Sequence, residues 1–498
     1  MELLSKKKYS EISSLPLLVK EYLAEKYFSD DYSINSNNSK PNRSLLSEIL
    51  KNENMRYGAD DLAIKNAELL NNDDVEVVIA GQQPCLFTGP AYIIYKAATV
   101  LHLAEKLRER GQKAVPVFWV ATEDSDFLEV NHAQIGTERY VEELSLSAGI
   151  VGNAKVPTAF PQMLQSMKIS DDIYDFGDYF CFLLTKMFKG TGLVIADPRK
   201  FRCLSREIKK EEILNPLLAT AKFNDLTGIL KSKGIKPQID KAENITNIYL
   251  FDGQKRARLR YDGKTFANDY GDKFSAEYLV EQIDNIIPNA ILRPIIQEHI
   301  FRSRYFIAGI NELNYLLLLP RLFELFNVNI PEFVIRNGFF VLDKQNIDFL
   351  NTNNIHIDEI LTNFAAAKET IFQHEKTINA YDNYVSEIED QLRFITCLSK
   401  DNEATLERSA LSITKKIEKQ LNLLRKKNIK HLRDKSGSPI KGLYNINEQL
   451  FPKGVLQERC YNIFTYAKSV EEANEMVHNI LNIMRENDFD TGELGVIF

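Results

Sequence analysis

Two short apolar stretches flank one long helical pattern in the first quarter of the chain. Residues 75–80 and 114–121 are almost entirely apolar, which is typical of strands covered on both faces of a parallel sheet. Residues 90–110 repeat apolar positions at helical spacing, and Gly111 ends the pattern. A strand, a helix and a strand in this order predict a right-handed βαβ unit.

The same kind of pattern returns later in the chain. Residues 192–197, 304–309 and 333–342 are predicted as further strands of the main sheet. Short alternating segments between turn residues predict small β-rich insertions at about residues 137–165 and 225–285. The predicted fold class is therefore α/β, with a parallel sheet in its core.

The C-terminal part has a different character, because residues 365–432 contain neither glycine nor proline. One apolar seam with heptad-like spacing runs through it: Leu406, Ala410, Ile413, Ile417 and Leu424. Such a seam predicts a long helix that returns as an antiparallel hairpin or pairs with another subunit. The seam is interrupted, so a two-helix hairpin and one uninterrupted rod both remain open. Residues 436–454 are predicted as a loop.

The length of 498 residues allows a large core with an appendage, because single cores rarely exceed about 250–300 residues. Three parts are predicted: a core over residues 1–360, a helical coiled-coil domain over 361–468, and a segment over 469–498 that returns to the core.

The composition excludes several classes of function. A net charge of −7 gives no sign of a nucleic-acid partner. The residues after Met1 lack the apolar stretch of a signal peptide, and the longest aliphatic run, 316–319, is far too short to span a bilayer. The five cysteines lie far apart, as expected of reduced thiols. We therefore expect a cytoplasmic protein with no membrane and no nucleic-acid partner.

The loop after the first strand is the first candidate binding site. Loops at the carboxyl ends of parallel strands surround the crevice in which α/β proteins bind ligands. Gly81 would allow close approach of the backbone, and Gln82 and Gln83 could donate and accept hydrogen bonds without adding charge. We expect these three residues to contact a substrate or nucleotide.

The helix that follows this loop could also bind an anion. Thr88 is predicted as its N-cap, and the free N–H groups of a helix starting at Gly89 would favour a phosphate or carboxylate. Thr88, Tyr92 and Lys96 follow at intervals of four, so Lys96 could reach back toward the anion. An ordinary turn with a solvated lysine is the alternative, since neither common phosphate-loop motif is present.

Three carboxylates follow the second strand: Glu123, Asp124 and Asp126, with Asn131 close behind. Crowded carboxylates need an ammonium group, a metal or strong donors nearby. They could hold a substrate amine, act as a general base on an attacking amine, or bind Mg²⁺, for which the spacing is not diagnostic. Capping of a helix N-terminus is the alternative.

A third group of polar residues surrounds the later strands. Glu312, Asn314 and Tyr315 follow the strand at 304–309 directly. Arg293 and Arg336 lie near strand ends, where an arginine suits bidentate binding of a carboxylate or phosphate. All five are predicted binding residues.

These motifs together resemble the BshC family, the cysteine-adding enzymes of bacillithiol biosynthesis. The resemblance runs in the same order over nearly the whole chain, through residues 77–97, 115–131, 291–301, 306–315 and 450–462. The family's motif positions are occupied by Gly81, Gln82, Gln83, Thr88, Gly89, Pro90, Lys96, Glu123, Asp124, Asp126, Asn131, Arg293 and Glu312. The chain departs from the family at Ile310-Asn311, where a glycine-containing turn is usual, and at Ile335-Arg336, where Pro-Arg is usual.

The resemblance implies a class I synthetase-like Rossmann core with connecting insertions, and a C-terminal coiled coil that forms a homodimer. It also implies binding of ATP or ADP, and a final pathway step that joins cysteine to glucosaminyl-malate. Class I synthetases use histidines in the first loop, and residues 81–90 contain none. Adenylate formation is therefore an inference from fold and reaction.

The resulting hypothesis is a ligase that forms an amide between the cysteine carboxylate and the amine of glucosaminyl-malate. Glu123, Asp124 and Asp126 would bind or deprotonate the amine, and Arg293 or Arg336 would hold the malate carboxylates. The loop at 81–89 would hold the nucleotide, accompanied by Mg²⁺ if needed, or an acidic substrate group. Two alternatives remain open: a non-catalytic nucleotide-binding scaffold, and another synthetase-like transferase.

Overall fold

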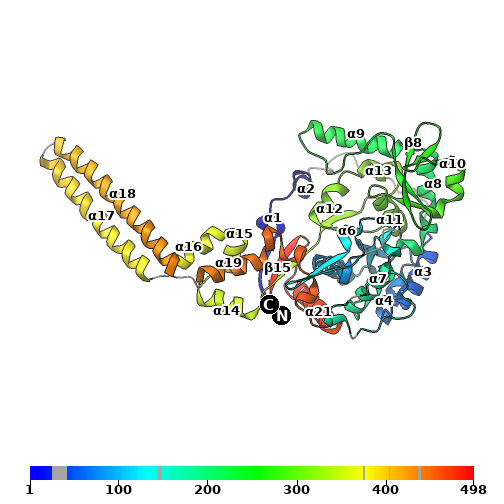
Figure 1. The fold of residues 1–498 in the computed structure, drawn as a ribbon, viewed down its shortest axis with the longest axis horizontal. Helices are drawn as coiled ribbons and strands as arrows, with labels where there is room; N and C mark the ends of the chain where they lie inside the picture. The colour runs from blue at the N-terminus through cyan, green and yellow to red at the C-terminus, as the bar shows by residue number, and fades with distance from the viewer. Residues whose placement is uncertain are drawn as a thin grey trace. The chain divides into compact units, whose positions relative to one another are not determined.

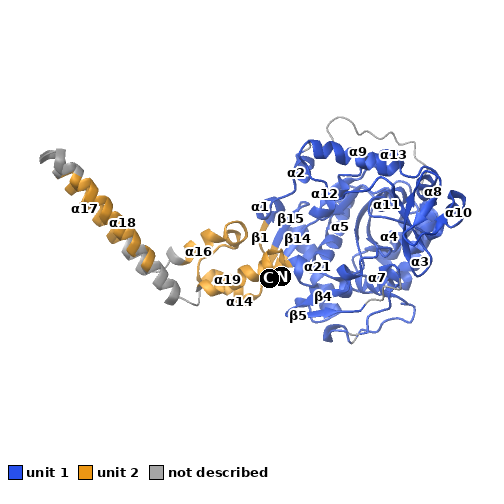
Figure 2. Cartoon of the chain, turned by 45° about the horizontal axis from the view of Figure 1, so that its top comes forward, with its two compact units in different colours: residues 1, 7–339, 458–495 blue, residues 2–6, 340–457, 496–498 orange. Residues whose placement is uncertain are grey.

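The computed structural model alternates strands and helices as expected for an α/β protein (Figure 1). It describes residues 1–24, 42–143, 149–158, 160–165, 167–373, 376–402, 404–435 and 439–498. These form two compact units (Figure 2): residues 1, 7–339 and 458–495, and residues 2–6, 340–457 and 496–498. The divisions after residues 339 and 457 come earlier than the boundaries expected after residues 360 and 468.

A five-stranded parallel sheet forms the centre of the first unit. Its order is β13 (Glu332–Ile335), β12 (Tyr305–Ala308), β2 (Glu76–Gln82), β3 (Ala114–Val120) and β6 (Val194–Ala196). β2, the first of these strands along the chain, is central. β3 and β6 follow on one side of it, and β12 and β13 lie on the other side. The order therefore reverses between β2 and β12, at the switch point where doubly wound sheets bind ligands. The predicted α/β class with a Rossmann-like core is confirmed.

Helices cover this sheet. α5 (Tyr92–Glu109) connects β2 to β3 and packs against both strands. α3 (Arg43–Arg56) and α4 (Asp61–Leu69) contact β6. The C-terminal α21 (Val470–Glu486) packs against α5 and α7 (Phe176–Met187), so the end of the chain adds a helix to the first unit (Figure 1).

A second, antiparallel sheet lies between β6 and β12 in the chain. Its order is β10 (Lys273–Phe274), β9 (Phe266–Asn268), β8 (Arg256–Tyr261), β7 (Ile245–Phe251) and β11 (Ile286–Pro288). A separate hairpin consists of β4 (His132–Ile135) and β5 (Glu138–Val141). α8 (Arg206–Leu214) and α9 (Leu218–Ser232) pack against β7, and α12 (Ile310–Leu316) packs against β12 and β13 of the parallel sheet. The other helices of this part of the chain are α6 (Phe127–Val130), α10 (Ala276–Glu281), α11 (Arg293–Phe301) and α13 (Pro320–Leu325).

The prediction of one main-sheet strand over residues 333–342 is wrong. β13 ends at Ile335, and β14 (Gly338–Val341) belongs to a three-stranded sheet in the order β1 (Leu3–Lys8), β15 (Glu493–Ile497), β14. The division between the two units runs through these three strands. Arg336 and Asn337 break the strand, because the Asn337 N–H is bonded to Thr99 Oγ1 (2.9 Å) instead of a neighbouring strand.

The second unit is mostly helical. Its helices are α14 (Lys344–Thr352), α15 (Ile357–Thr362), α16 (Phe364–Gln373), α17 (Lys376–Asn402), α18 (Ala404–Lys435) and α19 (Pro439–Leu450). The two long helices, α17 and α18, pack along each other as a hairpin, which decides against one uninterrupted rod (Figure 1). Among the described helices, none combines the length and apolar character needed to cross a bilayer.

The loop expected at 436–454 is instead largely helix α19. Leu443, Ile446 and Leu450 are buried at helical spacing. Gly442 lies against the ring of Phe349, where any side chain would collide with that ring. The glycine therefore serves close packing inside a helix, and residues 436–438 lie outside the described residues.

Candidate functional site

A pocket of about 340 Å³ opens at the switch point of the parallel sheet. Gly81 and Gln82 at the end of β2, and Gly309 directly after β12, form part of its wall. Side chains from α5, α11 and α12 and from the segments after β3 and β13 complete it. This volume is near the lower end for ligand sites, so it suits one small ligand.

Lys96 lies at the inner end of this pocket and is 2% exposed. Its Nζ donates to the carbonyl of Gly81 at 2.8 Å and to Glu312 Oε2 at 2.6 Å. Burial lowers the pKa of Lys96, and the charge of Glu312 opposes this shift. Because Glu312 also accepts from the Gly309 N–H at 3.2 Å, the pair fastens the end of β2 to the start of α12. The charge of Lys96 is therefore already compensated inside the protein.

Arg336 is likewise compensated. Its guanidinium forms a buried ion pair with Glu458 and donates to Tyr9 Oη at 2.7 Å. It also lies 5.2 Å from the centre of the Tyr92 ring. Burial would lower the pKa of Arg336, but Glu458 and Tyr9 raise it overall. Arg336 lines the pocket as a fixed, paired charge.

Two other arginines in the pocket are not paired in this way. Arg293 donates to Tyr315 Oη at 2.9 Å, and Arg459 lies 5.9 Å from the centre of the Tyr92 ring. Neither guanidinium has a carboxylate within ion-pair distance among the described residues. Burial raises the pKa of Tyr315 to about 12, so this phenol stays protonated at neutral pH. Arg293 and Arg459 thus place two guanidinium groups in the pocket wall.

The acidic segment, residues 123–126, does not gather its carboxylates at one point. Glu123 binds Arg202 Nε at 2.5 Å. Asp126 caps α6 by accepting from the Glu129 N–H at 3.2 Å, which is the alternative role considered for this group. Asp124 alone lines the pocket, where it accepts from Gln83 Nε2 at 3.0 Å.

Glu129 joins Asp124 as a pocket carboxylate that the sequence reasoning missed. It lies one turn of α6 beyond Asp126, so its position in the same stretch was the available signal. Gln83 Nε2 donates to both carboxylates, at 3.0 Å to Asp124 and at 3.4 Å to Glu129. Among the described residues, no group of three or more His, Cys, Asp or Glu side chains is arranged to hold a metal ion.

The prediction that a helix starts at Gly89 with Thr88 as its N-cap is wrong. α5 begins at Tyr92, and Thr88 and Gly89 have positive φ angles of 70° and 68° and do not line the pocket. Asn462 donates to the carbonyls of Phe87 (2.7 Å) and Gly89 (2.6 Å). Asn462 of the C-terminal segment therefore holds this loop in place.

Two other predicted binding residues, Asn131 and Asn314, lie outside the pocket wall. Asn131 is the C-cap of α6 and is not part of the pocket wall. Asn314 reaches the pocket only through Gln238, to whose side chain it donates at 3.3 Å. Gln238, Asn311 and Arg459 line the pocket without having been predicted as binding residues. Arg459 lies in the family-like stretch 450–462, which was the signal for it, whereas nothing in the sequence marked Gln238.

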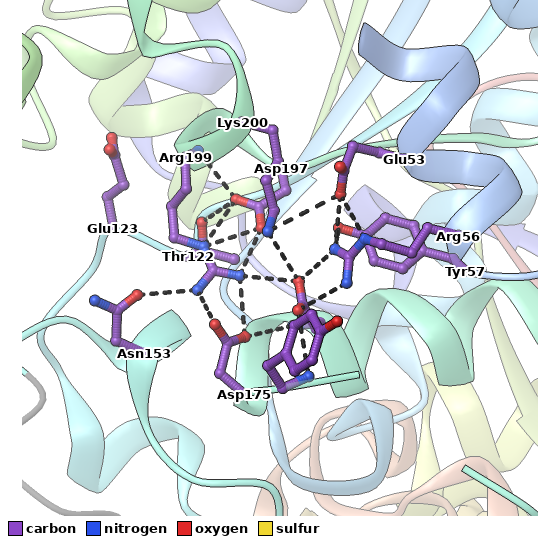
Figure 3. Close-up of polar contacts among 12 residues, drawn as sticks. Glu53, Arg56, Tyr57, Thr122, Glu123, Asn153, Asp175, Asp197, Arg199 and Lys200 are labelled. Atoms are coloured by element: carbon purple, nitrogen blue, oxygen red, sulfur yellow. Dashed lines mark hydrogen bonds and ion pairs between the residues drawn. The ribbon is translucent and has the colours of Figure 1, made fainter. Parts of the chain in front are cut away.

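A buried ionic network includes Thr122, the residue directly before the acidic segment (Figure 3). Arg199 donates to Asp175 and Asp197, each at 2.7 Å, and Thr122 Oγ1 donates to Asp197 at 2.6 Å. Burial alone would raise the pKa of Asp197, but Arg199 holds it below its ordinary value. Because Thr122 directly precedes the acidic segment, this network fixes the segment's position.

A pocket at the switch point of the sheet, lined by guanidinium and carboxylate groups, defines a Rossmann-like protein with a charged pocket. The family model for the bacillithiol biosynthesis BshC N-terminal Rossmann-like domain matches residues 17–337, and the model for the BshC C-terminal coiled-coil domain matches residues 339–488. The chain belongs to the BshC family.

Curated relatives agree with this assignment. A protein of Staphylococcus aureus (strain MRSA252) is 27% identical over 82% of this chain and 83% of its own length. Proteins of Bacillus cereus (strain AH820) and Geobacillus kaustophilus (strain HTA426) are each 26% identical over 85% of both chains. All three are named "Putative cysteine ligase BshC".

Proposed function

We propose that this protein is a cysteine ligase that joins the carboxylate of cysteine to the amine of glucosaminyl-malate. The observation that carries the proposal is that guanidinium groups and carboxylates line the same pocket. Arg293 and Arg459 offer two guanidinium groups without a carboxylate partner among the described residues, and Asp124 and Glu129 offer two carboxylates. Such a pocket suits a molecule that carries both carboxylate and ammonium groups, as both proposed substrates do.

The reaction needs an activated acyl group, because a free carboxylate and an amine do not condense favourably in water. We propose ATP as the co-substrate. The cysteine carboxylate would attack the α-phosphorus and release pyrophosphate, which leaves an acyl adenylate. The amine of glucosaminyl-malate would then attack the acyl carbon, release AMP and give its proton to a base. Both ATP and cysteine are cytoplasmic metabolites, so the proposed location is the cytoplasm.

The charged residues of the pocket suggest the following roles. Asp124 or Glu129 would receive the ammonium group and accept its proton during attack. Arg293 and Arg459 would hold carboxylates or phosphate oxygens, since a guanidinium binds either group through paired hydrogen bonds. Lys96, Glu312 and Arg336, whose charges are compensated internally, would hold the pocket in shape.

We also propose a homodimer formed through α17 and α18. These helices leave large apolar side chains in solvent, among them Phe394, Ile395, Ile413 and Leu424. Exposed apolar surface of this extent commonly marks an interface.

The direct test is turnover. The purified protein would be incubated with cysteine, glucosaminyl-malate and Mg-ATP, and the products analysed by mass spectrometry. We expect an amide product formed in equal amount with AMP. Release of ADP instead would replace the adenylate by an acyl phosphate. A folded protein that forms no amide would overturn the ligase proposal, and rescue of a deletion strain by Asp124→Asn would then favour a scaffold.

A further inference from the structure

A small recess of about 30 Å³ opens beside the main pocket. The two share Asp124 and Arg293 in their walls, so the recess adjoins the pocket. Trp119 and Ala121 form one side of it, from the end of β3. They are two residues apart, and alternate residues of a strand point to the same face, which explains why both contribute.

The tryptophan in this recess has an unused hydrogen-bond donor. Trp119 is 2% exposed, and its indole Nε1 has no hydrogen-bond partner among the described residues. The ring packs edge-on against Phe201 and Phe301, with ring centres 5.7 and 6.1 Å away. These contacts hold the ring in place, so it cannot turn its N–H toward solvent. Buried N–H groups are nearly always bonded, so this one calls for a partner that a ligand could supply.

The recess is matched in size to a particular side chain. A water-sized group needs roughly 10–15 Å³ measured in this way, so about 30 Å³ has room for two such groups. The side chain of cysteine contributes two heavy atoms beyond Cα, a methylene carbon and a sulfur. The side chains of valine, leucine and methionine contribute more heavy atoms beyond Cα. Pro198 and Pro288 add apolar surface for the methylene group.

We propose that the recess binds the side chain of the substrate cysteine, with the Trp119 N–H donating to its sulfur. The proposal rests on the ligase function above and specifies how the enzyme would select its amino acid. The charged groups of the substrate would stay in the main pocket, beside Asp124 and Arg293, and the sulfur would enter the recess. A site built to donate a hydrogen bond rejects an analogue that cannot accept it.

The test compares cysteine with 2-aminobutyrate, which has the same shape and a methyl group in place of the thiol. We expect wild type to prefer cysteine in kcat/KM by about tenfold or more. Trp119→Phe keeps an aromatic ring and removes the N–H. It should lower kcat/KM for cysteine about tenfold, leave that for 2-aminobutyrate within about twofold, and so abolish the preference. Ala121→Val fills the recess, so it should reduce kcat/KM for cysteine and for 2-aminobutyrate. It should leave kcat/KM for alanine as the substrate unchanged.

Tyr95→Phe is the matched control, because Tyr95 Oη is also buried without a partner among the described residues but lies outside both cavities. This variant should keep the wild-type preference. An unchanged preference in Trp119→Phe, with an unchanged melting temperature, would overturn the proposal. If wild type forms no amide, calorimetric affinities of wild type and Trp119→Phe for the two amino acids give the same ratio test. The recess and the ligase function can therefore fail separately.

Discussion

Lys96 and Glu312 form a 2.6 Å ion pair in the pocket although 216 positions separate them in the sequence. Both side chains are largely buried, so removing one charge leaves the other without compensation. Glu312→Gln should lower the free energy of unfolding by roughly 3 kcal/mol. The double variant Lys96→Met/Glu312→Gln should lose less than the sum of the single variants. Urea unfolding measures this, with Glu324→Gln on the exposed side of α13 as the control; additive losses would contradict it.

Asp124 and Asp126 should respond in opposite ways. Asp124 faces the pocket, so Asp124→Asn should reduce product formation by about 10²-fold, and stability should hardly change because asparagine still accepts hydrogen bonds. Asp126 caps α6, so Asp126→Ala should cost about 1 kcal/mol and leave the rate near normal. Melting curves and product assays on both variants decide the matter. A normal rate in Asp124→Asn would remove this carboxylate from the mechanism.

Gly89 should matter for folding and not for ligand approach. Its φ is +68°, and a Cβ there would lie 2.6 Å from Cys85 Cβ. Gly111 has a similar φ of +80° with open space around it. Gly111→Ala should therefore cost about 1 kcal/mol through backbone strain alone, whereas Gly89→Ala should cost distinctly more. Equal losses in chemical denaturation would show that crowding at Gly89 has no effect.

Glu298 should make stability depend on pH. Burial raises the pKa of this carboxyl from 4.5 to about 7, although Ser303 donates to it from both N–H and Oγ. Between these two values the folded state binds the proton more tightly than the unfolded chain, so the free energy of unfolding falls as pH rises.

The contribution of Glu298 should amount to about 3 kcal/mol over that interval, at roughly 1.4 kcal/mol per pKa unit. Glu298→Gln should remove this part of the slope and stabilise the protein at pH 8. Glu475→Gln, on the exposed side of α21, should follow the wild-type curve. Denaturation series at several pH values measure the difference, and parallel curves for wild type and Glu298→Gln would contradict the prediction.

Apolar side chains on α18 should determine oligomeric state. Ile413 is 57% and Leu424 48% exposed, and each buried leucine or isoleucine gains roughly 1.5–3 kcal/mol. We expect a dimer by light scattering at micromolar concentration, and a monomer for Ile413→Glu/Leu424→Glu. Lys416→Glu on the same helix should remain dimeric. A monomeric wild type would contradict the proposed interface.

The spacing of apolar residues predicted the strands and helices whose burial pattern is visible within a short stretch of sequence. β2, α5 and β3 follow directly from two apolar runs and one helical repeat, because burial on both faces of a parallel sheet leaves a clear signal. The switch-point pocket follows from the strand order, since Gly81 and Gly309 end neighbouring strands. Asp124 and Arg293 could therefore be selected from sequence.

The failures come from partners far away in the chain. The start of α5 is set by Asn462, which binds the carbonyl of Gly89 across 373 positions. The role of Arg336 is set by Glu458, which turns a predicted ligand-binding arginine into a paired one. Helix α19 replaces most of the loop expected at 436–454, and its Gly442 lies directly against the ring of Phe349.

Glu458 pairs with Arg336, Arg459 lines the pocket and Asn462 holds the loop at Phe87, which has a consequence for biosynthesis. The ribosome makes the parallel sheet first and must then add residues 340–457 before these side chains exist. At about 5–20 residues per second that interval lasts on the order of ten seconds. Throughout this interval, Arg336 lacks the carboxylate of Glu458, and the loop at Phe87 lacks the side-chain amide of Asn462. A premature stop in the coiled coil therefore yields a chain that has every strand of the parallel sheet and an incomplete pocket wall.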